Sequence, residues 1–116
     1  MAFRKIVEKL TKPTDEVDRE RLTSWCDAQG GTPLCDVESR RPVFIAGEVR
    51  SVRIVPRAGA AALEATVHDG RGTVVAVFLG RRRISGLAPG RRMTLQGVVS
   101  DDRGERLMYN PIYTLA

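Results

Sequence analysis

The fold is decided by the stretch VFIAGEVRSVRI at residues 43–54. From Val43 to Val49 every second residue is apolar or glycine, which is the period of a half-buried strand. Beyond Arg50 the phase reverses, because the next apolar residues are Val52 and Ile54. One extra residue near Arg50-Ser51 restores a continuous inward face, so we predict a β-bulge there. A long, bent strand that contains a glycine is typical of a small closed barrel, in which one strand serves both halves.

Four more strands are predicted after this one. We expect them at residues 63–68, 73–79, 93–99 and 105–115, with turns at the sequences PRAG (56–59), DGRG (69–72) and DDRG (101–104). The strand Thr73–Leu79 is nearly continuously apolar, so it should be covered on both faces or present apolar groups to a ligand. Pro111 confines the second half of the last strand to an edge or an irregular stretch.

Five strands in about 75 residues, with a longer connection only after the third, predict an all-β fold: a five-stranded Greek-key barrel. The longer connection leaves only residues 81–87 for a helix, so that helix is expected to be short or absent. An SH3-like barrel or a β-sandwich also fits the strand count, but either one explains the bent first strand less well.

The first 41 residues have a different pattern and predict an N-terminal helical extension. Phe3, Ile6, Val7 and Leu10 follow the i, i+3, i+4, i+7 spacing of an amphipathic helix. A second helix is expected over Asp15–Ala28, with acidic residues in its first turn, followed by a polar connector. We therefore divide the chain into residues 1–41, the helical extension and connector, and residues 42–116, the barrel.

The net charge of +5 is unevenly distributed. Residues 1–39 hold six Lys or Arg against eight Asp or Glu, whereas residues 40–116 hold thirteen against six. A basic domain favours a polyanion partner, because its surface concentrates phosphates nearby. All thirteen of those cations are arginine, and a GC-rich genome would produce the same bias without selection for charge.

Composition excludes several classes of protein. No apolar run approaches the roughly 20 residues of a membrane span, and the charged N-terminal stretch has no signal-peptide core, so we expect a cytoplasmic protein. A structural zinc site takes four Cys or His ligands, and the chain has only Cys26, Cys35 and His68. We therefore expect two reduced thiols, no metal and no cofactor.

Six short segments together resemble the OB-fold nucleic-acid-binding family: GEV (47–49), ATVHDGRGT (65–73), VFL (77–79), LAPG (87–90), LQGVV (95–99) and MYNP (108–111). The likeness is greatest to the wedge domain of RecG-type branch-migrating helicases and to small stand-alone actinobacterial OB-fold proteins, and it covers roughly residues 43–116. The sequence contains no P-loop glycine-lysine motif and no helicase motor. The resemblance therefore implies a binding module without a catalytic site.

The ligand groove of an OB fold crosses strands two and three between the first and last hairpin loops. On this basis the candidate nucleic-acid-binding residues are Arg50, Arg53, Arg57, Thr66, His68, Arg71, Phe78, Arg103, Arg106 and Tyr109. Phe78 and Tyr109 are the stacking candidates, although aromatic residues of small barrels commonly belong to the core. Arg81, Arg82 and Arg83 provide either a second phosphate contact or solubility. His68 and Asp69 are adjacent, but no nucleophile or second carboxylate lies at a catalytic spacing, so no enzyme is predicted.

Two functions follow from these observations. The first is a module that binds single-stranded or junction DNA or RNA through arginine–phosphate contacts, with limited base stacking because only 5% of the residues are aromatic. The alternative is a protein–protein interaction adaptor, in which the barrel is a scaffold and the amphipathic face of Phe3–Leu10 docks a protein partner.

Overall fold

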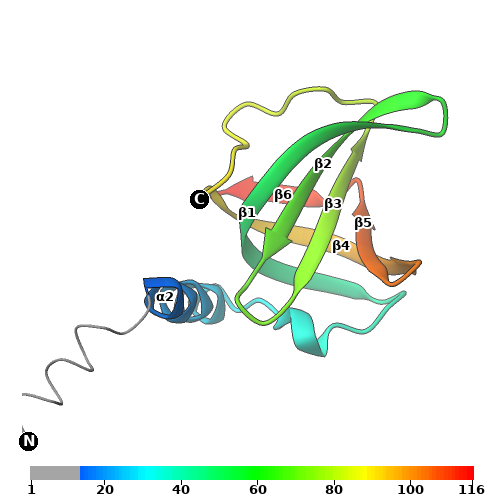
Figure 1. The fold of residues 1–116 in the computed structure, drawn as a ribbon. Helices are drawn as coiled ribbons and strands as arrows, with labels where there is room; N and C mark the ends of the chain where they lie inside the picture. The colour runs from blue at the N-terminus through cyan, green and yellow to red at the C-terminus, as the bar shows by residue number, and fades with distance from the viewer. Residues whose placement is uncertain (1–13) are drawn as a thin grey trace, which may run out of the picture.

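The computed structural model describes residues 14–116 and shows a closed sheet with one helix packed beside it (Figure 1). The elements are α2 (Thr14–Ala28), the 3-10 turn η1 (Leu34–Asp36), β1 (Pro42–Arg57), β2 (Ala60–His68), β3 (Thr73–Leu79), β4 (Arg92–Asp102), β5 (Glu105–Tyr109) and β6 (Ile112–Leu115). The amphipathic segment predicted at Phe3–Leu10 lies outside the described residues. Among the described residues, no helix is long and apolar enough to cross a membrane.

Strand β1 closes the barrel because it pairs with two neighbours. Its residues 42–48 pair with β4 and its residues 48–57 pair with β2. The register passes from Val49 opposite Val67 to Ser51 opposite Thr66, so Arg50 is an extra residue. This confirms the predicted bulge, which lets one strand bend around both halves of the barrel. The antiparallel pairs β2–β3 and β4–β5 and the parallel pair β3–β5 complete the circuit.

The last strand is divided in two. The sequence predicts one strand over 105–115, whereas β5 and β6 follow each other along β4 and are separated by Asn110-Pro111. Asn110 takes a left-handed backbone conformation (φ 47°), and Pro111 has no N–H to donate to a ladder. The break is joined to β3, because Asn110 N–H donates to the Val77 carbonyl and the Asn110 side chain accepts from Leu79 N–H. The connection after β3 contains no helix, as expected.

The barrel interior is filled by alternating apolar residues of all the long strands, with β3 buried on both of its faces as its composition predicts. The supposedly polar connector contributes to this core as well. Leu34 is fully buried and Val37 nearly so, and both belong to the main cluster. The connector therefore packs into one end of the barrel and is not a separate linker.

Within the described residues helix α2 runs from Thr14 to the predicted end at Ala28, and it packs on the outer side of β1. Leu22 and Cys26 contact Ala46, and the guanidinium of Arg92 lies 5.3 Å from the centroid of the Trp25 ring. Both cysteines are free thiols, Cys26 buried and Cys35 exposed.

Candidate functional site

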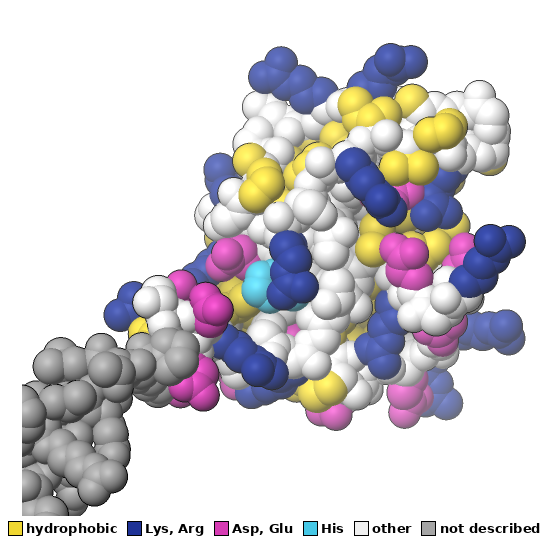
Figure 2. Space-filling model, viewed as in Figure 1, with side chains coloured by type: hydrophobic (Ala, Val, Ile, Leu, Met, Phe, Trp, Pro, Cys, Tyr) yellow, Lys and Arg dark blue, Asp and Glu magenta, His cyan; other side chains and the backbone are white. Residues whose placement is uncertain are grey.

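The side chains that alternate with the core form an outer face on β1, β2, β3 and β5. The strand registers order this face into rows that run across the strands. One row contains Arg53, Glu64, Val77 and Tyr109, and the next contains Ser51, Thr66, Val75 and Leu107. We call these two rows, together with the adjoining row of Val55, Ala62 and Leu79 and with Arg57 beyond it, the β2–β3 face. Figure 2 shows arginine side chains spread over this side of the molecule, with hydrophobic side chains between them toward β5.

The apolar residues of the β2–β3 face are covered. Ala62, Val75, Val77 and Leu107 form a second buried cluster although they point away from the barrel interior. A flat outer surface would leave these side chains in water. Their burial means that neighbouring side chains cover them, and Figure 1 shows that β1 bends strongly across this side of the barrel.

A charged cluster occupies one row of this face. The Glu64 carboxylate accepts hydrogen bonds from Arg53 Nη2 at 3.2 Å and from Arg57 Nε. Arg57 also donates to the Tyr109 hydroxyl at 3.3 Å, and its guanidinium lies 5.9 Å from the centre of that ring. The hydrogen bond with Glu64 raises the pKa of Arg57 above its ordinary value. Tyr109 itself remains 44% exposed, so its ring is available to a ligand.

A cavity of about 390 Å³ lies at the far end of the face, near the β2–β3 and β4–β5 turns. Thr66, Thr73 and Val75 line it together with Arg71 and Arg106. The guanidinium of Arg106 donates to the Leu34 carbonyl, so it is held by the connector. Arg103 lies at the exposed β4–β5 turn with a left-handed backbone conformation (φ 53°).

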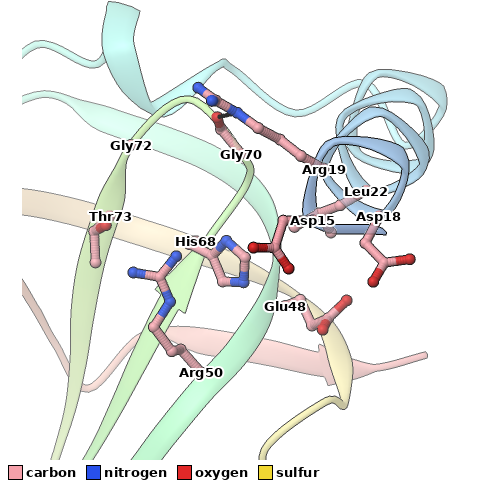
Figure 3. A pocket seen from close by; sticks show the side chains of 10 residues that line it. All are labelled: Asp15, Asp18, Arg19, Leu22, Glu48, Arg50, His68, Gly70, Gly72 and Thr73. Atoms are coloured by element: carbon pink, nitrogen blue, oxygen red, sulfur yellow. Dashed lines mark hydrogen bonds between the residues drawn. The ribbon is translucent and has the colours of Figure 1, made fainter. Parts of the chain in front are cut away.

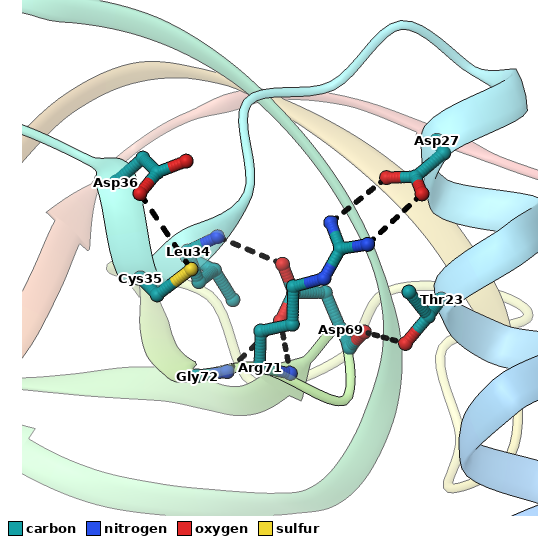
Figure 4. A network of polar contacts seen from close by, with 8 residues as sticks. All are labelled: Thr23, Asp27, Leu34, Cys35, Asp36, Asp69, Arg71 and Gly72. Atoms are coloured by element: carbon teal, nitrogen blue, oxygen red, sulfur yellow. Dashed lines mark hydrogen bonds and ion pairs between the residues drawn. The ribbon is translucent and has the colours of Figure 1, made fainter.

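The β2–β3 turn is fixed by the buried carboxylate of Asp69. Its Oδ1 accepts from the backbone N–H of Arg71 (2.8 Å) and Gly72 (2.9 Å), and its Oδ2 accepts from Leu34 N–H at 2.8 Å (Figure 4). The Arg71 guanidinium then meets both oxygens of Asp27 at 2.9 and 3.0 Å. In this structure Arg71 ties α2 to the barrel, and the predicted contact of Arg71 with a ligand remains a prediction.

A second cavity, of about 510 Å³, separates α2 from the sheet. Arg50 and His68 point into it from β1 and β2, and Asp15 and Asp18 face them from the helix (Figure 3). Burial lowers the pKa of His68, and the charge of Arg50 lowers it further, whereas Glu48 and Asp69 oppose the shift. Charges of both signs line this space, so it does not form a phosphate site. No group of three or more Cys, His, Asp or Glu side chains in the described residues could hold a metal ion.

No family model matches this chain, and no curated protein matches it. Among solved structures, the chain is similar to one chain of a replication protein A heterotrimer bound to single-stranded DNA, with a TM-score of 0.50 and 13% identity. The match covers 65% of this chain and 57% of that chain. The barrel is an OB fold. At this identity the likeness concerns the fold alone, and the chain spans little more than half the length of its structural neighbour.

OB folds bind their ligands on the face of the second and third strands, between the first and last hairpin loops. The β2–β3 face occupies this position here, between the turns at Ala58-Gly59 and Arg103-Gly104. Of the predicted residues, four lie together on the face, namely Arg53, Arg57, Thr66 and Tyr109. Arg71, Arg103 and Arg106 lie toward its far end, and Arg50 and His68 line the cavity beside α2.

The prediction that Phe78 stacks on a base is wrong for this structure. The ring is 3% exposed and packs edge-on against Tyr113 within the barrel, with the centroids 5.4 Å apart. Sequence reasoning also missed Glu64. Its importance depends on Arg53 lying directly opposite across β1 and β2, and a single sequence does not give that register.

Proposed function

We propose that this OB fold binds single-stranded nucleic acid on the β2–β3 face. The observation that carries the proposal is the exposed ring of Tyr109 with the guanidinium of Arg57 beside it, at the position where OB folds hold ligands. Single strands offer unpaired bases that stack on aromatic rings, whereas a duplex hides them. The structural neighbour is described as bound to single-stranded DNA, which supports the same choice.

In this proposal a base stacks on Tyr109 and the neighbouring phosphates meet arginines on both sides of it. Of the two guanidinium groups that hold Glu64, that of Arg53 is the more accessible, because its side chain is 64% exposed and that of Arg57 only 24%. Arg103 adds charge at the β4–β5 turn. At the other end of the face, Gly80 N–H donates to the Ala61 carbonyl. Arg81–Arg83 therefore follow directly after the point where β2 begins and β3 ends. One stacking ring and several guanidinium groups predict binding that weakens with salt and depends little on base sequence.

The test is fluorescence anisotropy with labelled single-stranded, forked and duplex DNA and single-stranded RNA, across a salt series. We expect Tyr109→Ala to weaken binding of single strands by about 1–3 kcal/mol, the usual contribution of one stacked base. Phe44→Ala is the matched control, because Phe44 is a comparably exposed aromatic residue (38%) on the β1–β4 side of the barrel. Absence of binding at low salt, or equal losses in the two variants, would refute the proposal.

The adaptor function is favoured by a different observation. Phe44, Gln96 and Ile112 form one row across β1, β4 and β6, and Phe44, Ile112 and nearby Val98 are all exposed. An exposed apolar row suits a protein partner better than a polyanion. If the nucleic-acid binding experiment fails, this second function is tested by a search for bound proteins. A protein that binds the wild type should not bind a variant in which Ile112 and Val98 are replaced by Ser.

A further inference from the structure

Glu64 is a charged residue in the middle of the β2–β3 face, and its side chain is 0% exposed although it points away from the barrel. A buried carboxylate is costly unless cations and hydrogen bonds compensate for its lost hydration. Here two guanidinium groups cover it, one on each carboxylate oxygen. The sheet therefore holds a fixed carboxylate in the region where the proposed ligand would place its phosphates.

The two arginines hold the carboxylate with unequal freedom. Arg57 has a side chain only 24% exposed, and besides Glu64 it touches the Tyr109 hydroxyl and ring. Arg53 meets Glu64 through Nη2 alone, at 3.2 Å, and is 64% exposed. An incoming phosphate can therefore reach Arg53, whereas Arg57 remains fixed beside the stacking ring.

The carboxylate also sets the charge of the face. Two guanidinium groups and one carboxylate give a local charge of about +1 where the arginines alone would give +2. By contrast, the side chains of Arg81–Arg83 and Arg103 at the ends of the face have no polar partner within residues 14–116. Charge is thus available at the ends of the face and partly neutralised at its centre.

We propose that Glu64 competes with the phosphates of the ligand for Arg53, so that the wild-type face binds one phosphate fewer than its arginines would allow. This inference rests on the proposed function and concerns the selectivity of the same site. Glu64 lowers the affinity for every polyanion, but it keeps Arg57 against Tyr109, where a stacked base gains most. The face therefore favours single strands, whose bases stack, over duplexes, which offer phosphates alone.

The test compares Glu64→Gln with Glu16→Gln, which removes the same charge from an exposed position of α2. We expect E64Q to bind single-stranded DNA about fivefold more tightly at low salt, since one repulsive charge a few ångströms from a phosphate is removed. The slope of log affinity against log salt should steepen by about 0.7, the amount expected for one additional bound phosphate. Duplex affinity should rise more than single-strand affinity, so the preference for single strands falls. E16Q should change none of these quantities.

Arg53 gives a second test that does not depend on E64Q being stable. Because Arg53 is already paired, Arg53→Gln should weaken binding less than Arg103→Gln does. An Arg53→Gln loss as large as the Arg103→Gln loss, or an E64Q protein that binds no better than E16Q, would overturn the inference. If the wild type binds single strands and Tyr109→Ala binds them more weakly, either result removes only the role of Glu64. If neither the wild type nor E64Q binds, the proposed function falls as well.

Discussion

His68 makes the stability of the fold depend on pH. Burial and the charge of Arg50 hold its pKa below the usual 6.5 in the folded protein. Between these two values the unfolded chain takes up a proton that the folded protein does not, so unfolding is favoured as the pH falls. We expect the free energy of unfolding of the wild type to decrease more than that of His68→Gln from about pH 7.5 to about pH 5.

Urea unfolding at several pH values measures this difference, because the titrating carboxylates are common to both proteins. The two curves should run parallel above the usual pKa of His68 and separate below it. Curves that stay parallel throughout would show that His68 titrates alike in the folded and unfolded states.

The two thiols should react at very different rates. Cys26 is 6% exposed, and burial, followed by the charge of Asp69, raises its pKa to about 11. At about pH 8 only about one Cys26 in a thousand is a thiolate. We expect a disulfide reagent to label Cys35 rapidly in the native protein and Cys26 only after unfolding. Cys35→Ser should remove the fast phase, and a fast phase that survives this substitution would contradict the assignment.

At the scale of elements, the connector that contains η1 stabilises the barrel. Leu34 is fully buried in the main core cluster, and a Cβ added to Gly72 would lie 2.9 Å from the Leu34 Cβ, so the two segments are closely packed. Leu34→Ala should cost about 2–5 kcal/mol of unfolding free energy, as core truncations do. Leu95→Ala on β4 is the matched core control. A loss below about 1 kcal/mol for Leu34→Ala would mean that the connector detaches from the barrel.

The sequence predicts an element well when its pattern repeats, and poorly when one residue carries the information. The bulge at Arg50 is visible because the apolar phase reverses on either side of it. The burial of Leu34 is not visible, because a single apolar residue in a polar segment has no period. Phe78 is an intermediate case. Strand β3 is apolar on both faces, so its sequence does not show which residues point inward. The structure shows that Val74, Ala76 and Phe78 do.

At the scale of the whole molecule, composition predicts the net charge but not which charged side chains pair with one another. Residues 40–116 carry an excess of positive charge, but several of the arginines form ion pairs with carboxylates of the same protein. Arg71 pairs with Asp27, Arg92 with Glu48, and Arg53 and Arg57 with Glu64. These pairings depend on which strands become neighbours and on where α2 packs, so counting cations overestimates the charge offered to a ligand.

The run Arg81–Arg83 tests this view of the molecule, because the sequence leaves its role open. All three side chains are exposed, and the run starts beside the edge of β2 and β3. If phosphates pass this edge, replacing all three by Gln should reduce the salt slope by about 0.7 for each phosphate that is no longer bound, and weaken single-strand binding in proportion. A protein with Arg21, Arg40 and Arg41 replaced has the same net charge and should keep the wild-type slope. Equal slopes for the two triple variants would mean that Arg81–Arg83 act only through the overall charge, and the path of the nucleic acid would then be confined to the β2–β3 face.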